Sequence, residues 1–336
     1  MKSPAAQIII FLFLLSLSTE AIAQRINPLP VIAGAKEDIN YLGGKYLGPV
    51  GVALGNGLNN SWYSSARVHS LLGFHLNIAP SLVIVPSDDQ TFVIENSKLK
   101  ELELVDERDN VAPTAFGPNE DGPLLRSKAI GNFQTFNSPA GVGFSFLPLA
   151  NINLGVGVGF NTEVDVRYFP KSQISGLEDA KIGLFGFGAI HEVSQWFMDD
   201  DEPAFSLSVQ AGFSSISYEQ PIKDGDDGQE LTMKSNGTTF RGIISKQFSF
   251  FTLFGGVGYN SADTDINLRG TYSYQPPVGP ATTITDPISI NTTANSVVFN
   301  LGGRILIAEA ISIFADYTYA QYSSITLGLG VDLNFE

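Results

Sequence analysis

The sequence predicts an all-β protein, a transmembrane antiparallel β-barrel of about 10–14 strands that carries an N-terminal plug segment. Three observations support this fold class. Residues 152–168 alternate between apolar side chains and glycine, amide or charged side chains. Further alternating stretches, separated by turn residues, continue to the C-terminus. A short apolar stretch at the N-terminus has the composition of an export signal.

The stretch from Ile152 to Tyr168 has the clearest alternation in the chain. Successive side chains of a strand point to opposite faces, so one face of this stretch is apolar and the other is polar. We interpret residues 152–169 as one long strand that crosses a bilayer at a tilt. Its polar face would then line a wet lumen. On this interpretation Val158→Arg would cost about 2–4 kcal/mol on the lipid face, and Gly157→Ser much less.

The first residues predict a signal peptide over residues 1–23. Lys2 supplies a positive charge, Ile8–Leu17 an apolar stretch, and Ala21–Ala23 a small-x-small cleavage site before Gln24. The apolar stretch is shorter than the roughly 20 residues of a membrane-spanning helix, and an uncleaved anchor is the alternative. We therefore expect export of the mature chain to the outer membrane.

Residues 24–70 do not alternate, and we interpret them as a plug or hatch segment. Ala33–Tyr46 has the spacing of a short helix, which Gly48 and Pro49 should end. Large apolar side chains occur here outside any strand pattern, so we expect them to be buried inside the barrel. These plug candidates are Leu42, Tyr46, Leu54, Leu58 and Trp62.

Residues 71–336 form the predicted barrel. Short turns alternate with long loops, as in outer-membrane barrels, whose long loops face outward. Residues 191–203 depart from this rule and have helical spacing, which predicts an interfacial helix. The C-terminal stretch alternates up to a penultimate aromatic, Phe335, which is typical of barrels inserted into outer membranes. Further strands within 87–137 and 267–290 are left as an open alternative. The expected strands cover about 71–85, 139–148, 152–169, 179–190, 204–218, 231–247, 250–266, 291–307, 310–320 and 324–335.

A set of polar side chains falls on the face expected to point inward. One interpretation is that they pair with one another and fill a narrow barrel, and the other is that they line a polar conduit or a ligand path. A wide open pore is disfavoured, because aqueous porins have about 16 strands. The lumen-facing candidates are Glu163, Asp165, Arg167, Gln210, Arg304 and Asp316.

The composition and the motifs argue against several function classes. The net charge of −15 argues against nucleic-acid binding, and the absence of cysteine excludes thiol chemistry. The three histidines, His69, His75 and His191, lack metal-ligand spacing. A nucleophile motif of the Gly-x-Ser-x-Gly type is also missing. We therefore predict no enzyme activity, no cofactor and no metal site.

Two sets of motifs resemble known outer-membrane barrels. The start of long-chain fatty acid transporter (FadL-like) barrels is similar to Gly51-Val-Ala-Leu-Gly-Asn-Gly57, Asn59–Ala66 and Leu72–Leu76. An uncharacterised family of Gram-negative outer-membrane β-barrels resembles the chain at Ala66-Arg-Val-His69, Leu72–Phe74, Thr162–Pro170, and His191 with Gln195-Trp196. The first resemblance implies an N-terminal plug and a hydrophobic substrate taken from outside. This chain reads Tyr63-Ser-Ser-Ala66 where FadL-like barrels commonly have Asn-Pro-Ala.

These features predict a barrel that transports or binds a small hydrophobic molecule, such as a long-chain fatty acid. The alternative is a structural or scaffold barrel that acts through its loops or with a secretion-machinery partner. A continuous apolar pocket behind the plug would favour transport, whereas a lumen filled by paired charges and large ordered loops would favour a scaffold. The expected partners are outer-membrane lipid, a small hydrophobic ligand or an unidentified protein, and not nucleic acid.

Overall fold

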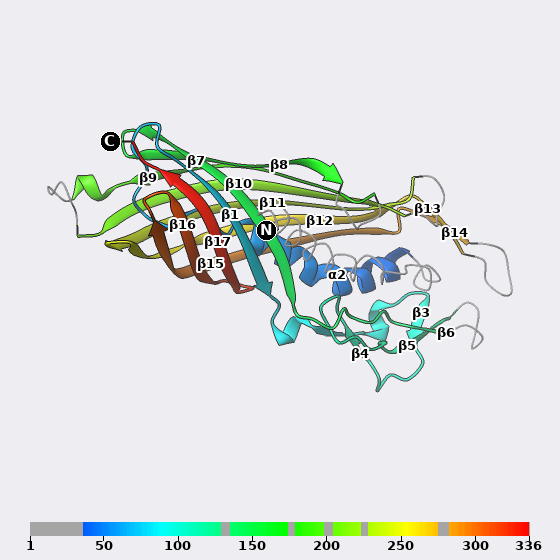
Figure 1. Cartoon of the computed structure of the whole chain (residues 1–336). Coiled ribbons are helices and arrows are strands. Elements are labelled where there is room, and N and C mark those ends of the chain that lie inside the picture. Colours follow the sequence, from blue (N-terminus) through cyan, green and yellow to red (C-terminus); the bar gives the residue numbers. More distant parts are fainter. Residues whose placement is uncertain are drawn as a thin grey trace, which may run out of the picture.

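The computed structural model describes residues 36–128, 135–173, 179–197, 204–222, 228–274 and 282–335. Within these residues, ten antiparallel strands form a closed barrel (Figure 1), which confirms the predicted fold class. Strand β1 (Phe74–Ile84) pairs with both β7 (Phe146–Gly159) and β17 (Ser324–Leu333), and this closes the sheet. The other barrel strands are β8 (Thr162–Gln173), β9 (Lys181–Glu192), β10 (Ser206–Pro221), β11 (Glu230–Phe248), β12 (Phe251–Arg269), β15 (Ile288–Ile307) and β16 (Ile311–Tyr319). The predicted signal peptide lies outside the described residues and stays a prediction.

The prediction of one strand over residues 152–169 is wrong, because this stretch is a hairpin. Strands β7 and β8 meet at Phe160 (φ 53°) and Asn161 (φ 51°), and positive φ at both positions is the mark of a type I′ turn. In a hairpin with a two-residue turn, the residue before the turn pairs with the residue after it, and both point to the same face. Such a turn alone would therefore shift the inward and outward alternation by one residue. A β-bulge in β7 just before the turn adds one residue, so Gly157 is paired with Glu163. The alternation therefore continues through the turn, and the sequence shows no break.

The expected strand over residues 139–148 is also wrong, since β7 begins only at Phe146. The residues before it pack against another part of the chain: the Val142 N–H donates to the Ala115 carbonyl at 3.0 Å. This backbone bond takes the place of pairing in the barrel.

The outer face of the barrel is apolar and the inner face is polar, which is the reverse of a soluble protein. In β17, Leu327 is 61% exposed, whereas the neighbouring Thr326 is fully buried. Strand β16 alternates in the same way. Soluble monomers rarely expose apolar patches beyond a few hundred Å², so this face suits contact with lipid. Among the described helices, none is long and apolar enough to cross a membrane.

Helix α2 (Lys36–Leu58) packs against the inward faces of β15 and β12 (Figure 1). The prediction that Gly48 and Pro49 end a helix is wrong, because the helix continues through both. Glycine is a poor helix former, but in α2 it permits close approach: a Cβ on Gly55 would lie 2.7 Å from the Cβ of Ala262. Packing against the wall thus overrides the local preference.

Residues 59–70, here called the interior segment, run from the end of α2 to the end of the barrel where the turns are short. The segment bonds to buried side chains of the wall, as where the Ala66 N–H donates to Ser245 Oγ at 2.9 Å. At its end, the Ser70 N–H donates to Asn334 Oδ1 at 2.8 Å. The chain then turns into β1.

The described residues of the long connection between β1 and β7, 85–128 and 135–145, form a folded unit that we call the loop module. The carboxylate of Asp38 in α2 accepts backbone N–H bonds from Lys100, Glu101 and Leu102 at 2.6–2.8 Å, which fastens the module to the helix. Its described elements are β2 (Thr91–Val93) paired with β4 (Val111–Pro113), β3 (Leu102–Leu104) with β5 (Leu124–Ser127) and β6 (Thr135–Asn137), and the 3₁₀ turns η2 (Ser87–Asp89) and η3 (Asn96–Lys98).

Two smaller elements complete the described fold. Strands β13 (Thr271–Tyr274) and β14 (Thr282–Thr285) form a hairpin at the same end as the loop module (Figure 1). Where a helix is predicted over residues 191–203, the described part holds only the 3₁₀ turn η5 (Ser194–Trp196), and residues 198–203 lie outside the description.

Candidate functional site

The polar interior of the barrel is the candidate functional site, and two arginines anchor the interior segment there. Arg167 of β8 is fully buried, and its guanidinium donates to the carbonyl oxygens of Leu58, at 2.8 Å, and Asn60. Arg241 of β11 donates to the Asn59 carbonyl at 3.0 Å. These carbonyls lie at the C-terminal end of α2, where helical carbonyls lack intrahelical partners and positive charge is favourable. We call this group the arginine anchor.

Trp62 completes the arginine anchor. The Arg167 guanidinium lies over the Trp62 ring, 3.6 Å from its centroid, in a cation–π contact. The wall leaves room for this ring, since a Cβ on either Gly188 or Gly212 would lie 2.7 Å from a ring atom. Next to it, the Tyr63 O–H donates to Asn300 Oδ1 at 2.5 Å. The interior segment is thus fitted to the wall by shape as well as by hydrogen bonds.

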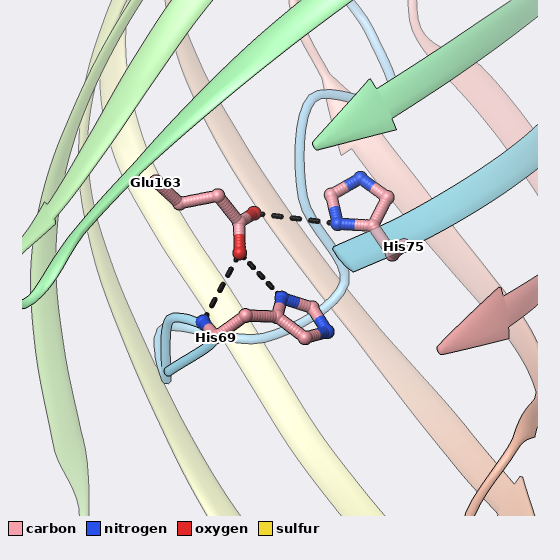
Figure 2. Close-up of side chains that lie close together, drawn as sticks. All are labelled: His69, His75 and Glu163. Atoms are coloured by element: carbon pink, nitrogen blue, oxygen red, sulfur yellow. Dashed lines mark hydrogen bonds and ion pairs between the residues drawn. The ribbon is translucent and has the colours of Figure 1, made fainter. Parts of the chain in front are cut away.

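Nearer the short-turn end lies a second group, the histidine–carboxylate cluster of His69, His75, Glu163, Asp165 and Asp332. Figure 2 shows the first three of these residues. His69 Nδ1 makes a short contact with Glu163 Oε2, and the His69 backbone N–H donates to the same oxygen at 3.1 Å. The other oxygen of Glu163 lies 3.3 Å from His75 Nδ1. One buried carboxylate therefore lies between two imidazoles.

Each imidazole of the cluster faces a second carboxylate with its other nitrogen. His69 Nε2 lies 3.3 Å from Asp332 Oδ1, and His75 Nε2 lies 3.4 Å from Asp165 Oδ1. Asp332 in turn accepts a hydrogen bond from Arg304 at 2.5 Å. The second oxygen of Asp165, Oδ2, is buried without a hydrogen-bond partner. Such groups are costly to bury, so they mark a place where a proton or a ligand is held.

The fold assembles this cluster from distant parts of the chain. His69 comes from the interior segment, His75 from β1, and Glu163 and Asp165 from β8, while Asp332 comes from β17. Four members of the cluster, His69, His75, Glu163 and Asp332, line a cavity of about 20 Å³, which is room for about one water molecule. The arrangement can hold a proton or a small cation.

The structure distributes the sequence-predicted site residues over several places. Glu163 and Asp165 belong to the cluster, Arg304 is a half-buried partner of Asp332, and Arg167 belongs to the anchor. Gln210 is buried with no hydrogen bond to its side-chain amide, and Asp316 is buried and accepts a hydrogen bond from Thr318 at 3.2 Å. Of the plug candidates, Leu42, Tyr46, Leu58 and Trp62 are buried, whereas Leu54 is partly buried.

Sequence reasoning missed the histidines of the cluster. Neither His69 nor His75 lies at a recognised metal-ligand spacing, so the sequence pattern does not indicate a shared site. A signal was nevertheless present: His75 shares the inward parity of β1 with the buried Asn77. A histidine on the inward face of a barrel strand calls for a polar partner, although its identity depends on the fold.

A closed antiparallel barrel with an apolar outer face, a hydrogen-bonded polar interior and long loops at one end defines a β-barrel of the outer-membrane class. The family is shown by sequence: the model of a family of unknown function, DUF6588, matches residues 1–333, and the chain belongs to this family. A search of curated proteins found no match.

Solved structures of outer-membrane barrels are similar to the chain at low identity. The outer-membrane protease OmpT of Escherichia coli is 9% identical, with 81% of this chain and 100% of that chain covered and a TM-score of 0.33. Ail of Yersinia pestis, in complex with the heparin analogue sucrose octasulfate, is 9% identical over 79% of this chain and 100% of that chain, with a TM-score of 0.28. The translocator domain of the autotransporter NalP from Neisseria meningitidis is 10% identical over 89% and 98%, with a TM-score of 0.29.

Proposed function

We propose that this protein is an exported outer-membrane barrel that its own N-terminal segment keeps closed, and that it acts as a surface scaffold through its loop module. The observation that carries this proposal is the bonding between the interior segment and the wall. Hydrogen bonds join residues 59–70 to β7, β8, β9, β10, β11, β12, β15 and β17.

Closure follows from the way these bonds are distributed. A segment held on one side could swing away from that side and leave a passage. Bonds to strands all around the barrel would have to break together, and each buried partner left behind would cost about 1–3 kcal/mol. The resting barrel is therefore expected to pass no solute.

The loop module supports the scaffold role. It is tied to α2 through Asp38 and to the β16–β17 connection, where the Tyr322 O–H donates to an Asp89 carboxylate oxygen at 2.8 Å. Burial, together with this hydrogen bond, raises the pKa of Tyr322 well above its usual value, so the phenol stays protonated as a donor. An ordered surface of this kind can present a fixed face to a protein partner.

The interior of the barrel fits a scaffold role better than it fits transport of a small hydrophobic molecule. Arg167 and Glu163 bond to the interior segment and Arg304 bonds to Asp332, and the cavity beside them is of about water size. A long-chain fatty acid, as the FadL-like resemblance implies, would need the interior segment to leave first.

Conductance in planar bilayers tests closure. The wild-type protein should give no steady conductance, whereas a variant lacking residues 36–66 should conduct, because the strands that make its wall all follow Gly73. The matched control removes residues 271–285 instead, and two glycines then join Gly270 to Asp286, whose backbones already share a 2.9 Å hydrogen bond. This control should stay silent.

Two results would contradict the proposal. Steady conductance by the wild-type barrel, or a silent but folded deletion variant, would show that the interior segment does not close it. Saturable binding of a fluorescent long-chain fatty acid, one per barrel, would restore the transport hypothesis. Heat-modifiable migration in detergent gels checks that each variant is folded.

A further inference from the structure

We infer that the histidine–carboxylate cluster is a binding site for a divalent transition-metal ion of the Zn²⁺ class, with His69, His75 and Glu163 as its ligands. This inference goes beyond the proposed scaffold function and does not rest on it.

The three side chains converge as metal ligands do. Figure 2 shows the Glu163 carboxylate between the two imidazoles, each of which turns its Nδ1 toward it. One donor atom from each residue lies within 4.8 Å of the other two. Tetrahedral Zn²⁺ with bonds of about 2.0–2.1 Å places its ligand atoms ~3.3 Å apart. Small side-chain rotations therefore bring these donors to bonding distance.

The nitrogens that point away from Glu163 are oriented as in metal sites. A metal-bound histidine almost always donates its other ring N–H to a carboxylate, carbonyl or water, which fixes the tautomer and the ring orientation. Asp332 is in this position for His69, at 3.3 Å, and Asp165 for His75, at 3.4 Å. Simple ion pairing would not require both imidazoles to direct the same nitrogen at one shared carboxylate.

The charges also favour a bound cation. Three buried carboxylates, Glu163, Asp165 and Asp332, face the guanidinium groups of Arg304 and Arg167, so neutral imidazoles leave an excess of negative charge. Asp165 Oδ2, which is buried without a hydrogen-bond partner, points to the same deficit. A divalent ion would more than offset this single negative charge while keeping both imidazoles neutral, which is the form that binds metal.

The site has room for a fourth ligand, and an ion bound there would have a structural role. The adjoining cavity of about 20 Å³ can hold one water molecule, which would complete a tetrahedron. Because His69 belongs to the interior segment while His75 and Glu163 belong to the wall, the ion would fasten the segment to β1 and β8.

Metal analysis of the full chain, extracted in detergent and purified without a polyhistidine tag, tests the inference. After chelation, reloading with Zn²⁺ and dialysis, the protein should retain one Zn²⁺ per chain by elemental analysis. Co²⁺ should give the visible absorption of a tetrahedral site. Mg²⁺ should not be retained, since it prefers an octahedral shell of oxygen ligands.

The chain offers a matched control, because it has three histidines and no cysteine. His69→Gln, His75→Gln and Glu163→Gln should each lower Zn²⁺ retention by at least tenfold. His191→Gln should retain the wild-type amount, since His191 lies outside the cluster and its Nδ1 is 2.8 Å from Thr162 Oγ1. Heat-modifiable migration identifies variants that fail to fold, and Glu163→Gln, which keeps the shape of the side chain, is decisive among those that fold.

Absence of stoichiometric Zn²⁺ in the folded wild-type protein would overturn the inference, because the cluster would then hold protons only. Equal loss of metal in His191→Gln would overturn it as well. Neither result depends on conductance, so failure of the metal site and failure of the proposed closure are separate outcomes.

Discussion

Arg167 shows how single residues hold the interior of this barrel. Its partners are the carbonyls at the end of α2 and the face of Trp62, and Asp165 is two residues away on the same inward face. The side chain therefore serves a helix end, an aromatic ring and a buried carboxylate at once. A shorter or neutral residue could meet only one of these needs.

Replacing Arg167 by methionine should lower the free energy of unfolding by about 3–5 kcal/mol, because the helix-end carbonyls would lose their donor and the buried Asp165 would lose the nearby positive charge. Urea unfolding in detergent micelles, followed by tryptophan fluorescence, measures the change. Arg108→Met is the control: among the described residues this exposed arginine pairs with Asp106 alone, two residues before it, and its loss should leave unfolding unchanged. Similar losses in both variants would contradict the arginine anchor.

Gly157 has a role that its place in an alternating pattern does not reveal. A Cβ there would lie 2.0 Å from the Ser70 carbonyl oxygen and 2.5 Å from that of His69. Gly157→Ser should therefore push the interior segment away and abolish or strongly slow folding. Val158→Arg points outward beside the turn, where a lipid-face charge costs about 0–1 kcal/mol. This order reverses the one expected from sequence, and refolding yields in micelles would show which is right.

At the scale of elements, α2 owes its position to small residues. Its glycines differ in what surrounds them: a Cβ on Gly44 would meet no atom within 4 Å, whereas one on Gly55 would lie 2.7 Å from Ala262 and 3.3 Å from Ala294. The effect of a side chain at Gly44 therefore depends on helix propensity, whereas the effect of one at Gly55 depends on packing against the wall. The helix thus combines an open side and a side pressed against the wall.

The same substitution at these two glycines should have opposite effects. Gly44→Ala should stabilise the protein by up to about 1 kcal/mol, because alanine is the better helix former. Gly55→Ala should destabilise it by about 1–3 kcal/mol through overpacking against β12 and β15. Thermal unfolding of the two variants side by side measures both. Stabilisation by Gly55→Ala would mean that α2 does not press against the wall there.

At the scale of the whole molecule, the chain passes through the barrel before it builds the first strand. Lys36 Nζ donates to the Thr285 carbonyl at 3.2 Å, beside the long hairpin, while Ser70 bonds to Asn334 at the opposite end. Long loops of outer-membrane barrels face outward. The start of α2 is therefore expected outside the cell, and the short turns in the periplasm.

Single cysteines test this orientation, because the natural chain has none. In intact cells a membrane-impermeant maleimide should label Lys36→Cys and Glu107→Cys, since both positions are exposed at the long-loop end. Ser249→Cys, in the exposed short turn between β11 and β12, should be labelled only after the outer membrane is permeabilised. Labelling of Ser249→Cys alone in intact cells would mean the reverse orientation.

The sequence by itself determined the fold class, because the inward and outward alternation of each strand is a local property of its own residues. The same local reading failed at the β7–β8 turn, where a bulge preserves the alternation through Phe160 and Asn161. It also failed at Gly48 and Pro49, where helix propensity yields to packing against the wall.

Only the tertiary structure decided where the chemistry lies. His69 and Glu163 are 94 residues apart, and they meet because β1 pairs with β7, β7 with β8, and the interior segment returns through the barrel beside them. The alternation along a strand tells on which face a side chain lies, but not which side chains of other segments lie beside it. Those neighbours depend on strand register and on the path of the interior segment, which are set by contacts across the whole barrel. The arginine anchor and the histidine–carboxylate cluster are therefore properties of the closed barrel.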